Sequence, residues 1–236
     1  MQLPFFYKET IEPENGVVVL DEDNSRHAVS VLRMEAGGAL HLTDGKGLLL
    51  TASIAEPHKK KCRLTITGTM QVPAPARTTG IGISLVKNPV RFEWFLEKAT
   101  EIGVTEIFPL LCTRTEKQHF RADRMKNVMV SALLQSRQAW LPVLHAPLKF
   151  AAVLERPGFQ QQFIAHCIEE EKQSLAGALM GNNAGGLVCI GPEGDFTPAE
   201  IALALQQGFL PVALGNTRLR TETAGMVAAV LLQNAG

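Results

Sequence analysis

The segment "GLVCIGPEGDFTPAE", residues 186–200, decides the fold class of the chain around it. Its first five residues are mostly apolar and short enough to predict a buried strand. The turn that follows contains two glycines and a proline, which favour a tight change of direction. In "TPAE", Thr197 and Glu200 can satisfy each other's backbone amides, so a capped helix is predicted next. A strand, a tight turn and a capped helix are typical of an α/β layer.

The same alternation extends over residues 81–236. Strands are predicted at 81–86, 105–111, 161–167, 186–191 and 209–214, and helices at 89–103, 122–139, 198–207 and 222–233. Asn88, Pro89 and Gly103 suit the cap, the first turn and the C-terminal end of the first of these helices. This part of the chain is therefore predicted to be an α/β domain.

Residues 1–70 have a different pattern, with short β-rich runs at 16–20, 39–44, 47–54 and 62–70. "DGKG" at 44–47 predicts a turn between two of them, and a helix is expected at 24–34 with Asn24 or Ser25 as its cap. The spacing suggests a small barrel. Residues 71–80 contain two prolines and form the expected linker, so the predicted domains are 1–72 and 73–236.

Composition narrows the class of protein. With 236 residues, of which 46% are hydrophobic and 19% charged, the chain can bury a large core. Its apolar runs are shorter than the roughly 20 residues that cross a bilayer, and no signal-like segment precedes them, so we expect a cytoplasmic protein. The four cysteines are widely spaced, so we expect buried free thiols and no metal site.

Charge is distributed unevenly, although the net charge is zero. Basic residues outnumber acidic ones within 76–149, and "RTEKQHFRADRMK" at 114–126 has five basic residues against two acidic ones. Such a segment can neutralise RNA phosphates if its side chains share a face. A solvated helix face would have the same composition, so both interpretations stay open.

Several common signatures are absent from the sequence. It contains no phosphate-binding P-loop, no His-Glu-x-x-His and no Gly-x-Ser-x-Gly. "GIGISL" at 80–85 lacks the third glycine of a dinucleotide fingerprint. ATP-dependent, zinc-protease, hydrolase and NAD chemistry therefore have no support.

A second loop, "LGNTRLRTETA" at 214–224, follows the strand 209–214 as the first loop follows 186–191. The loops after parallel strands meet at one edge of a sheet, so we expect one ligand-binding crevice there. Thr221 or Thr223 could cap the helix that follows. Two alternatives remain: ordinary β–α connections, and a structural ion pair between Arg220 and Glu222 at the helix start.

The pair "GPEGDFTPAE" and "LGNTRLRTETA" resembles the paired loops of SPOUT-class RNA methyltransferases, and more narrowly those of the bacterial RsmE family. The resemblance continues in "RHAVSVLR" (26–33), "LTDGKG" (42–47), "LEKATEIGVTEIFPL" (96–110), "RT" (114–115) and "LLQSRQAWLPVL" (133–144). Two positions depart from that family: Asp195 replaces a common Gly, and Leu134 replaces a Glu.

The resemblance implies an α/β SPOUT domain with a trefoil knot, preceded by a PUA-like β-barrel. It implies a homodimer, S-adenosylmethionine as the cofactor, and methylation of N3 of a uridine in 16S ribosomal RNA of the small ribosomal subunit. The nearly uncharged last helix also favours burial, in a core or against a partner.

The resemblance also implies roles for individual residues. Arg220 and Glu222 are the candidate catalytic residues. The candidate cofactor-binding residues are Gly191, Pro192, Glu193, Gly194, Leu214, Gly215, Leu219, Arg220, Thr223 and Ala224. The candidate RNA-binding residues are Arg26, Arg33, Arg114, Arg121, Arg124, Lys126, Arg137 and Arg218. His27 and His166 are further proton-transfer candidates that stay outside the catalytic set.

Three alternatives to this function remain open. A non-catalytic RNA-binding module would explain the basic segment but not the paired glycine loops. A small-molecule transferase would explain the loops but not the basic segment. Another SPOUT RNA methyltransferase with a different target nucleotide would explain both.

Overall fold

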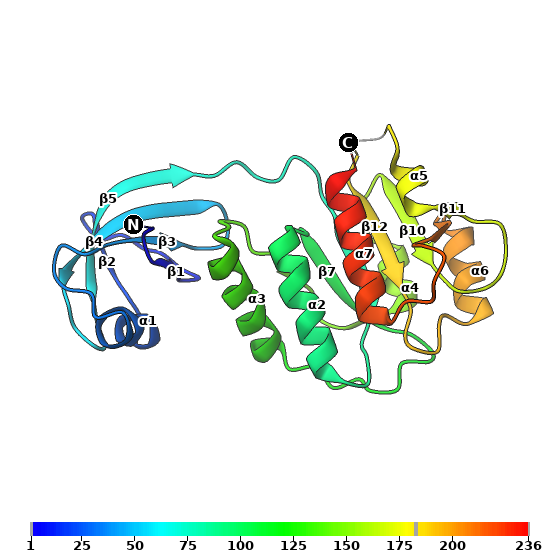
Figure 1. Ribbon diagram of the computed structural model, residues 1–236, viewed down its shortest axis with the longest axis horizontal. Coiled ribbons are helices and arrows are strands. Elements are labelled where there is room, and N and C mark those ends of the chain that lie inside the picture. Colours follow the sequence, from blue (N-terminus) through cyan, green and yellow to red (C-terminus); the bar gives the residue numbers. More distant parts are fainter. Residues whose placement is uncertain (1, 182–183, 236) are drawn as a thin grey trace. The chain divides into compact units, whose positions relative to one another are not determined.

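The structure is a computed structural model, which describes residues 2–181 and 184–235. The ends of the two predicted domains, Met1 and Gly236, lie outside the described residues. The chain divides into two compact units (Figure 1). Unit 1 comprises Met1–Ala74 and Leu133–Leu141, and unit 2 comprises Pro75–Ala132 and Pro142–Gly236.

Unit 1 contains five strands: β1 (Phe5–Tyr7), β2 (Val17–Val19), β3 (Ala39–Thr43), β4 (Leu48–Glu56) and β5 (Arg63–Gln71). They form one sheet in the order β1-β3-β4-β5-β2, and β1 is parallel to β3 while the other pairs are antiparallel. One apolar core lies against this sheet, with Phe6, Leu40, Leu50 and Leu64 at its centre. The predicted turn between β3 and β4 is confirmed, and the Asp44 carboxylate accepts from Lys46 N there at 2.7 Å.

The helix expected at 24–34 begins earlier and ends earlier. It consists of α1 (Glu22–Arg26) followed by a π-helical turn, η1 (His27–Val31). Asp21 caps it by accepting from Asn24 N, so the cap predicted at Asn24 or Ser25 was wrong. Ser25 is instead fully buried, where its hydroxyl accepts from Cys62 N at 2.9 Å. Its hydroxyl joins α1 to the segment before β5, which a local sequence pattern does not specify.

Residues 133–141 pack in unit 1 although they are distant from it in sequence. Leu141 N donates to Gly45 O at 2.8 Å, and Gly47 N donates to Ala139 O at 2.9 Å. The Trp140 indole N–H donates to Val72 O and Pro73 O. Trp140 therefore fixes the chain at the start of the predicted linker.

Unit 2 is built around parallel strands. These are β6 (Gly80–Ser84), β7 (Glu106–Leu111), β8 (Val143–Leu144), β9 (Leu148–Lys149), β10 (Gln161–Ala165), β11 (Gln173–Ser174), β12 (Gly186–Ile190) and β13 (Leu210–Ala213). Their order in the eight-stranded sheet is β11-β13-β10-β12-β6-β7-β8, and β9 also pairs with β7. The predicted α/β class is confirmed. The knot that the resemblance implies stays a prediction.

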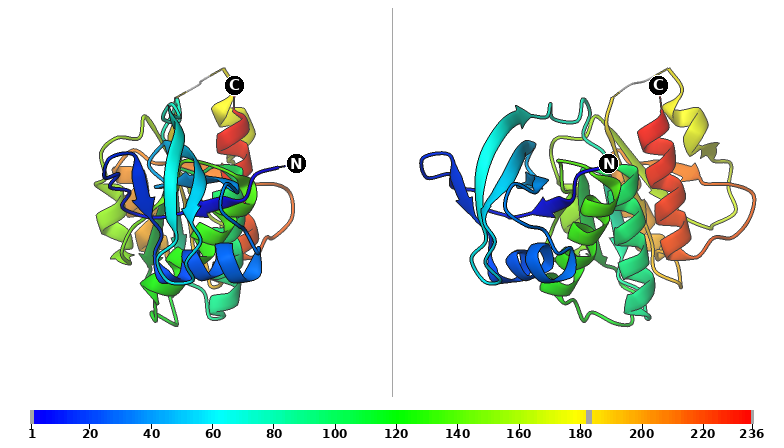
Figure 2. Two further views of the ribbon diagram at one scale, coloured as in Figure 1. Left: turned by 90° about the vertical axis from the view of Figure 1, so that its left-hand side faces the viewer. Right: turned by 60° about the vertical axis from the view of Figure 1, so that its left-hand side comes forward.

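The helices of unit 2 cover both faces of the sheet. They are α2 (Pro89–Ile102), α3 (Ala122–Ser136), which continues into unit 1, α4 (Phe150–Leu154), α5 (Leu175–Leu179), α6 (Pro198–Gln206) and α7 (Thr221–Asn234). α2 and α7 lie side by side on one face (Figures 1 and 2). α4 and α6 pack together over the apolar core, where Phe150 and Ile201 lie in one cluster with Leu187 and Cys189.

Gly225 lets α7 approach the sheet closely. A Cβ atom at this position would lie 2.8 Å from Ile83 Cδ1 and 2.8 Å from Phe95 Cε2, which is closer than atoms can pack. The residues of α7 that face inward, Ala228, Ala229 and Leu232, are buried. α7 is therefore packed within its own unit, and it positions the loop that precedes it.

The predicted starts of two helices are confirmed. Asn88 caps α2, with Pro89 in its first turn and Gly103 at its C-terminal end. Thr197 and Glu200 form the predicted capping box of α6. The cap of α7 was predicted wrongly, because Arg220 occupies the cap position without a side-chain hydrogen bond.

The short elements β1, β8, β9, β11, α4 and α5 were not predicted from the sequence. Each has two to five residues, and pairing or packing against distant segments decides its conformation. Among the described residues, no helix has both the length and the apolar character needed to cross a membrane.

Candidate functional site

Three loops meet at the carboxyl ends of neighbouring strands. β13, β10 and β12 are consecutive in the sheet and parallel. The segments 214–220, 166–172 and 191–197 follow them in the same order. Parallel α/β sheets bind ligands at this edge, so these loops are the candidate site.

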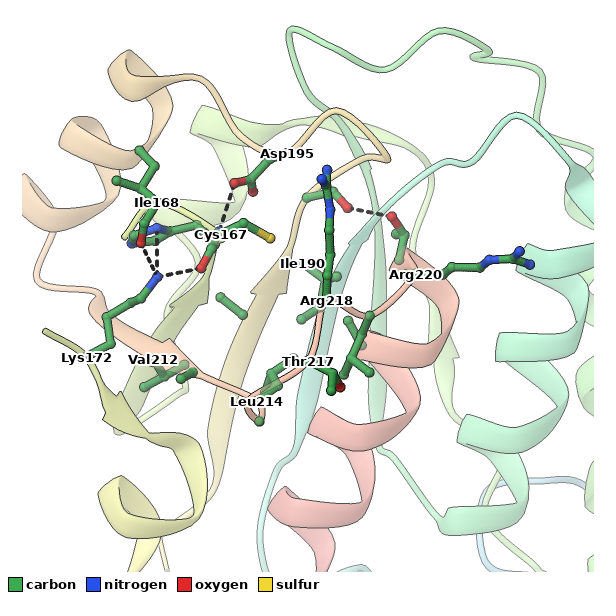
Figure 3. A pocket seen from close by; sticks show the side chains of 18 of the residues that line it. Cys167, Ile168, Lys172, Ile190, Asp195, Val212, Leu214, Thr217, Arg218 and Arg220 are labelled. Carbon is green, nitrogen blue, oxygen red and sulfur yellow. Dashed lines mark hydrogen bonds between the residues drawn. The ribbon is translucent and has the colours of Figure 1, made fainter. Parts of the chain in front are cut away.

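The loops enclose a pocket of about 860 Å³ (Figure 3). Nine of the residues proposed from the sequence line it: Gly191, Pro192, Glu193, Leu214, Gly215, Arg218, Leu219, Arg220 and Ala224. Gly194, Thr223 and Glu222 are described but do not line it. The predicted single crevice is present, while the binding role of each residue stays a prediction.

Thr221 joins the two loops that the sequence singled out. It is buried at the start of α7, and its hydroxyl donates to Gly191 O at 3.0 Å. Gly191 leaves little room for a side chain, since a Cβ atom there would lie 3.0 Å from Phe196 N. The sequence pattern indicated only a capping role for Thr221 and gave no sign of this bond between the loops.

The loop after β12 is also held from outside the pocket. Arg114 donates to Gly194 O at 2.6 Å, and Lys87 N donates to the Glu193 carboxylate at 3.0 Å. The turn closes on itself through Asp195 N and Pro192 O, which are 2.9 Å apart. Arg114, proposed from the sequence as an RNA contact, therefore also orders the loop.

Arg218 and Arg220 are both exposed and leave their loop in different directions (Figure 3). Arg220 extends away from the pocket toward α2, whereas Arg218 points across the pocket mouth. Glu222 is buried and does not pair with Arg220. Its carboxylate lies 3.7 Å from Arg91 Nε on α2, and its side chain is 9% exposed. The Arg220–Glu222 ion pair considered from the sequence is therefore not formed.

The other basic candidates belong to both units. Arg26 pairs with Asp23 at 2.6 Å in unit 1, where Arg33 and Arg137 are exposed with positive φ. In unit 2, Arg124 binds Glu93 through both of its carboxylate oxygens, at 3.1 and 2.8 Å. Arg121 is exposed in unit 2 and Lys126 is half-buried. A common RNA-binding face stays a prediction.

Segment 166–172 is the wall of the pocket that the sequence analysis missed. His166, Cys167, Ile168, Glu169, Glu170 and Lys172 line the pocket. The rule that placed the other two loops applies equally to the strand predicted at 161–167, so the sequence did contain this signal. Cys167 is exposed here, which corrects the expectation of buried thiols, while Cys62, Cys112 and Cys189 are buried.

His166 is buried in this wall. Its Nε2 lies 3.1 Å from the Glu170 carboxylate but is not aligned for a hydrogen bond, so it has no hydrogen-bond partner among the described residues. Burial lowers the pKa of His166, and the nearby Lys172 ammonium lowers it further. His27, the other candidate, is exposed on η1 and packs edge-on against Phe6 in unit 1. The described residues contain no cluster of three metal-ligating side chains.

Known proteins resemble this chain along most of its length. The family model for an RNA methyltransferase domain matches residues 74–233, and the model for an RNA methyltransferase PUA domain matches residues 20–67. The ribosomal RNA small subunit methyltransferase E of Synechocystis sp. is 30% identical over 94% of this chain and 75% of its own length.

Two solved structures are similar throughout. A probable rRNA-methyltransferase from Porphyromonas gingivalis has a TM-score of 0.89 and 37% identity, over 96% of this chain and 95% of its own. A ribosomal RNA small subunit methyltransferase E from Neisseria gonorrhoeae, solved bound to S-adenosylmethionine, has a TM-score of 0.83 and 26% identity over 98% of this chain and 97% of its own. The matches to both domain models and the likeness to these relatives show that the chain belongs to the family of ribosomal RNA small subunit methyltransferase E.

Proposed function

We propose that this protein transfers a methyl group from S-adenosylmethionine to N3 of a uridine in 16S ribosomal RNA, within the assembled small ribosomal subunit. The observation that carries the proposal is the single pocket formed by three loops in a member of this family. The solved relative from Neisseria gonorrhoeae binds S-adenosylmethionine, which supports the choice of cofactor. We also propose that the protein acts in the cytoplasm, because its ribosomal substrate is there.

The residues of the pocket fit this cofactor. Its volume of about 860 Å³ lies in the range of small-ligand sites. Ile190, Val212, Leu214 and Leu219 offer apolar contacts for an adenine ring, while the glycine-containing turns offer backbone N–H and C=O groups for its edge. Gly191, Pro192, Glu193, Leu214, Gly215, Leu219 and Ala224 would hold it directly. Gly194 and Thr223 would shape the surrounding turn and helix.

S-adenosylmethionine supplies an electrophilic methyl group when it is bound. The protein must orient the uracil and stabilise the negative charge that develops on the imide. Arg218, at the pocket mouth, and Arg220, beside it, supply guanidinium groups for the uracil oxygens and a phosphate.

Glu222 serves as the proton acceptor or as an orienting group. Its burial and its distance of 3.7 Å from Arg91 Nε favour the orienting role, with Arg91 as the partner. Arg91 was not among the candidates from the sequence, because no local pattern links it to a residue 131 positions away.

The RNA would be held by the basic residues of both units. Phosphate contacts position a substrate without specifying its sequence. We assign them to Arg26, Arg33, Arg114, Arg121, Arg124, Lys126, Arg137 and Arg218. A homodimer is also part of the proposal, supported by the exposed apolar side chains on two neighbouring helices, Val90 and Trp94 on α2 and Val230 on α7.

The decisive experiment is methylation of unmodified small ribosomal subunits with S-adenosylmethionine, followed by mass spectrometry of the nucleosides. We expect 3-methyluridine in 16S ribosomal RNA. A different methylated nucleoside would indicate another RNA methyltransferase of this class. Binding of RNA without any methylation, together with no heat of binding for S-adenosylmethionine, would indicate a non-catalytic RNA-binding protein.

Cofactor binding is tested separately by thermal unfolding. A ligand that binds only the folded state raises the melting temperature by mass action. S-adenosylmethionine should raise it, and NAD and ATP at the same concentration should not. Equal behaviour of all three ligands contradicts the cofactor assignment.

A further inference from the structure

Segment 166–172 has little in its own sequence to fix one conformation. None of its residues belongs to a helix or strand, since β10 ends at Ala165 and β11 begins at Gln173. Glu169, Glu170 and Glu171 are three consecutive exposed carboxylates, and like charges repel one another. Contacts from elsewhere must therefore select the conformation that lines the pocket.

Lys172 supplies contacts within the segment. Its ammonium group donates to His166 O at 2.6 Å and to Ile168 O at 2.7 Å, and it lies 3.4 Å from His166 Nδ1 (Figure 3). Lys172 directly precedes β11, whose Gln173 and Ser174 pair with β13. The lysine therefore ties the start of the segment to its end.

Asp195 supplies the contact to the neighbouring loop. One carboxylate oxygen accepts from Cys167 N at 2.8 Å (Figure 3). The other accepts from Phe196 N at 2.8 Å. Asp195 ends the turn that begins at Pro192, so it spans the pocket edge between two loops. Its φ of +63° lies in the left-handed region, which costs free energy for a residue with a side chain. A glycine would adopt this φ more easily, so the backbone conformation does not explain why an aspartate occupies this position.

We propose that Asp195 and Lys172 are positioning residues that hold segment 166–172 as the third wall of the cofactor pocket. The inference rests on the proposed function, because it assigns this wall to S-adenosylmethionine. Without the two contacts, the segment occupies open conformations for part of the time. The apparent dissociation constant then rises in inverse proportion to the population of the closed form that remains.

Asp195→Gly separates positioning from stability. Glycine removes the acceptor of the Cys167 amide and also relieves the left-handed backbone, so the melting temperature should not fall. The dissociation constant for S-adenosylmethionine should rise about tenfold, the effect of one hydrogen bond to a charged group. Asp195→Asn is the matched control, because asparagine tolerates this φ and keeps one acceptor oxygen for Cys167 N. Only the local bond to Phe196 N is lost, so the affinity should stay near that of the parent.

Lys172→Met tests the second contact, since methionine keeps an unbranched stem and removes the three donors. It should raise KM for S-adenosylmethionine several-fold while kcat at saturating cofactor stays near the parent value, because the lysine does not act on the reacting atoms. Lys149→Met, at an exposed lysine elsewhere in unit 2, should change neither constant.

Hydrogen exchange on the protein without cofactor measures the wall directly. Peptides spanning residues 166–172 should exchange faster in Asp195→Gly and Lys172→Met than in the parent, and at the parent rate in Asp195→Asn. This readout does not depend on activity.

The outcomes separate the inference from the proposed function. If the parent binds no S-adenosylmethionine by calorimetry, the proposed function fails, and the assignment of this wall fails with it. If the parent binds it and Asp195→Gly binds equally well, only the inference fails. Unchanged exchange in 166–172 in both variants also overturns the inference.

Discussion

At the scale of single residues, the site combines exposed cations with buried groups that hold them in place. Arg218 and Arg220 are exposed at the loop after β13, while Thr221 and Glu222 directly after them are buried. Thr221 bonds to Gly191 O, and Glu222 lies against Arg91. Arg218 and Arg220 therefore face solvent, where we propose that they meet the substrate, while Thr221 and Glu222 anchor the loop.

Arg220→Ala tests the catalytic role of an exposed cation. Arg220 is exposed, and its side chain makes no capping hydrogen bond to α7. The melting temperature and the cofactor affinity of Arg220→Ala should therefore stay near those of the parent. The methylation rate should fall about a hundredfold, the scale of losing one preorganised charge-stabilising donor. Arg220→Lys should recover little activity, because an ammonium does not reproduce the planar fork. A variant that unfolds far below the parent temperature but stays fully active when folded would show that Arg220 is structural.

His166 should make stability depend on pH. Its folded-state pKa is lowered by burial and by Lys172, whereas in the unfolded chain it titrates near its ordinary value of about 6.5. The unfolded state therefore binds a proton first as the pH falls, and stability is lost below about pH 6.5 until the folded-state pKa is passed. The free energy of unfolding, measured with urea at about pH 7.5 and about pH 5.5, should differ less between the two pH values for His166→Gln than for the parent. An equal difference would contradict the burial of a neutral imidazole.

At the scale of elements, the pocket depends on how three strands end together. β10, β12 and β13 are neighbours in the sheet, so the segments after them converge without being close in sequence. α7 continues directly from the loop after β13 and packs against α2, β6 and β12. The hydroxyl of Thr221 then joins the start of α7 to the loop after β12.

Thr221→Val removes this hydroxyl at nearly constant volume. It leaves Gly191 O without its partner in a buried place, which should lower the free energy of unfolding by about 1–3 kcal/mol. The affinity for S-adenosylmethionine should fall as well, because Gly191 lines the pocket. Thr69→Val, at an exposed position of β5, is the control and should leave both quantities unchanged. Chemical denaturation and calorimetry measure the two effects, and a fully stable Thr221→Val protein would contradict this account.

At the scale of the whole molecule, the protein must bind a large polyanion and present one pocket to it. The basic candidates occur in both units. Within the part of the chain that the structure describes, Arg26, Arg114 and Arg124 bind acidic or carbonyl partners, whereas the Arg121 side chain forms no such ion pair. This difference separates two arginines that the sequence treats alike, Arg121 and Arg124, which lie within one turn of each other.

Arg121 and Arg124 should respond differently to substitution. Each phosphate contact that is removed flattens the dependence of log affinity on log salt concentration by about one unit. Arg121 is exposed and should show this effect when replaced by alanine. Arg124 is held by Glu93 through two bonds, so Arg124→Ala should change the slope less. RNA-binding titrations between low and moderate salt measure the slopes. Unchanged slopes in both variants would place the RNA on another face.

The proposed homodimer should persist on dilution. Exposed apolar side chains on α2 and α7 favour an interface, since the cores of such interfaces are apolar. Sedimentation at low concentration should give twice the 25.7 kDa of one chain. Trp94→Asp should shift the distribution toward the monomer. A monomeric parent that still methylates would mean that α7 needs only the packing inside its own unit.

The sequence by itself determined the α/β class, the strands around the site, the caps of α2 and α6, and the two loops that form much of the pocket. These features depend on neighbouring residues: apolar periodicity, glycine turns and reciprocal hydrogen bonds over three or four positions. Only the tertiary structure decided that Glu222 lies against Arg91, that Thr221 bonds to Gly191, and that Trp140 packs in unit 1. Each of these contacts joins residues at least 30 positions apart. Such contacts form because sheet order and helix packing bring distant segments together, and no short-range pattern in the sequence records that order.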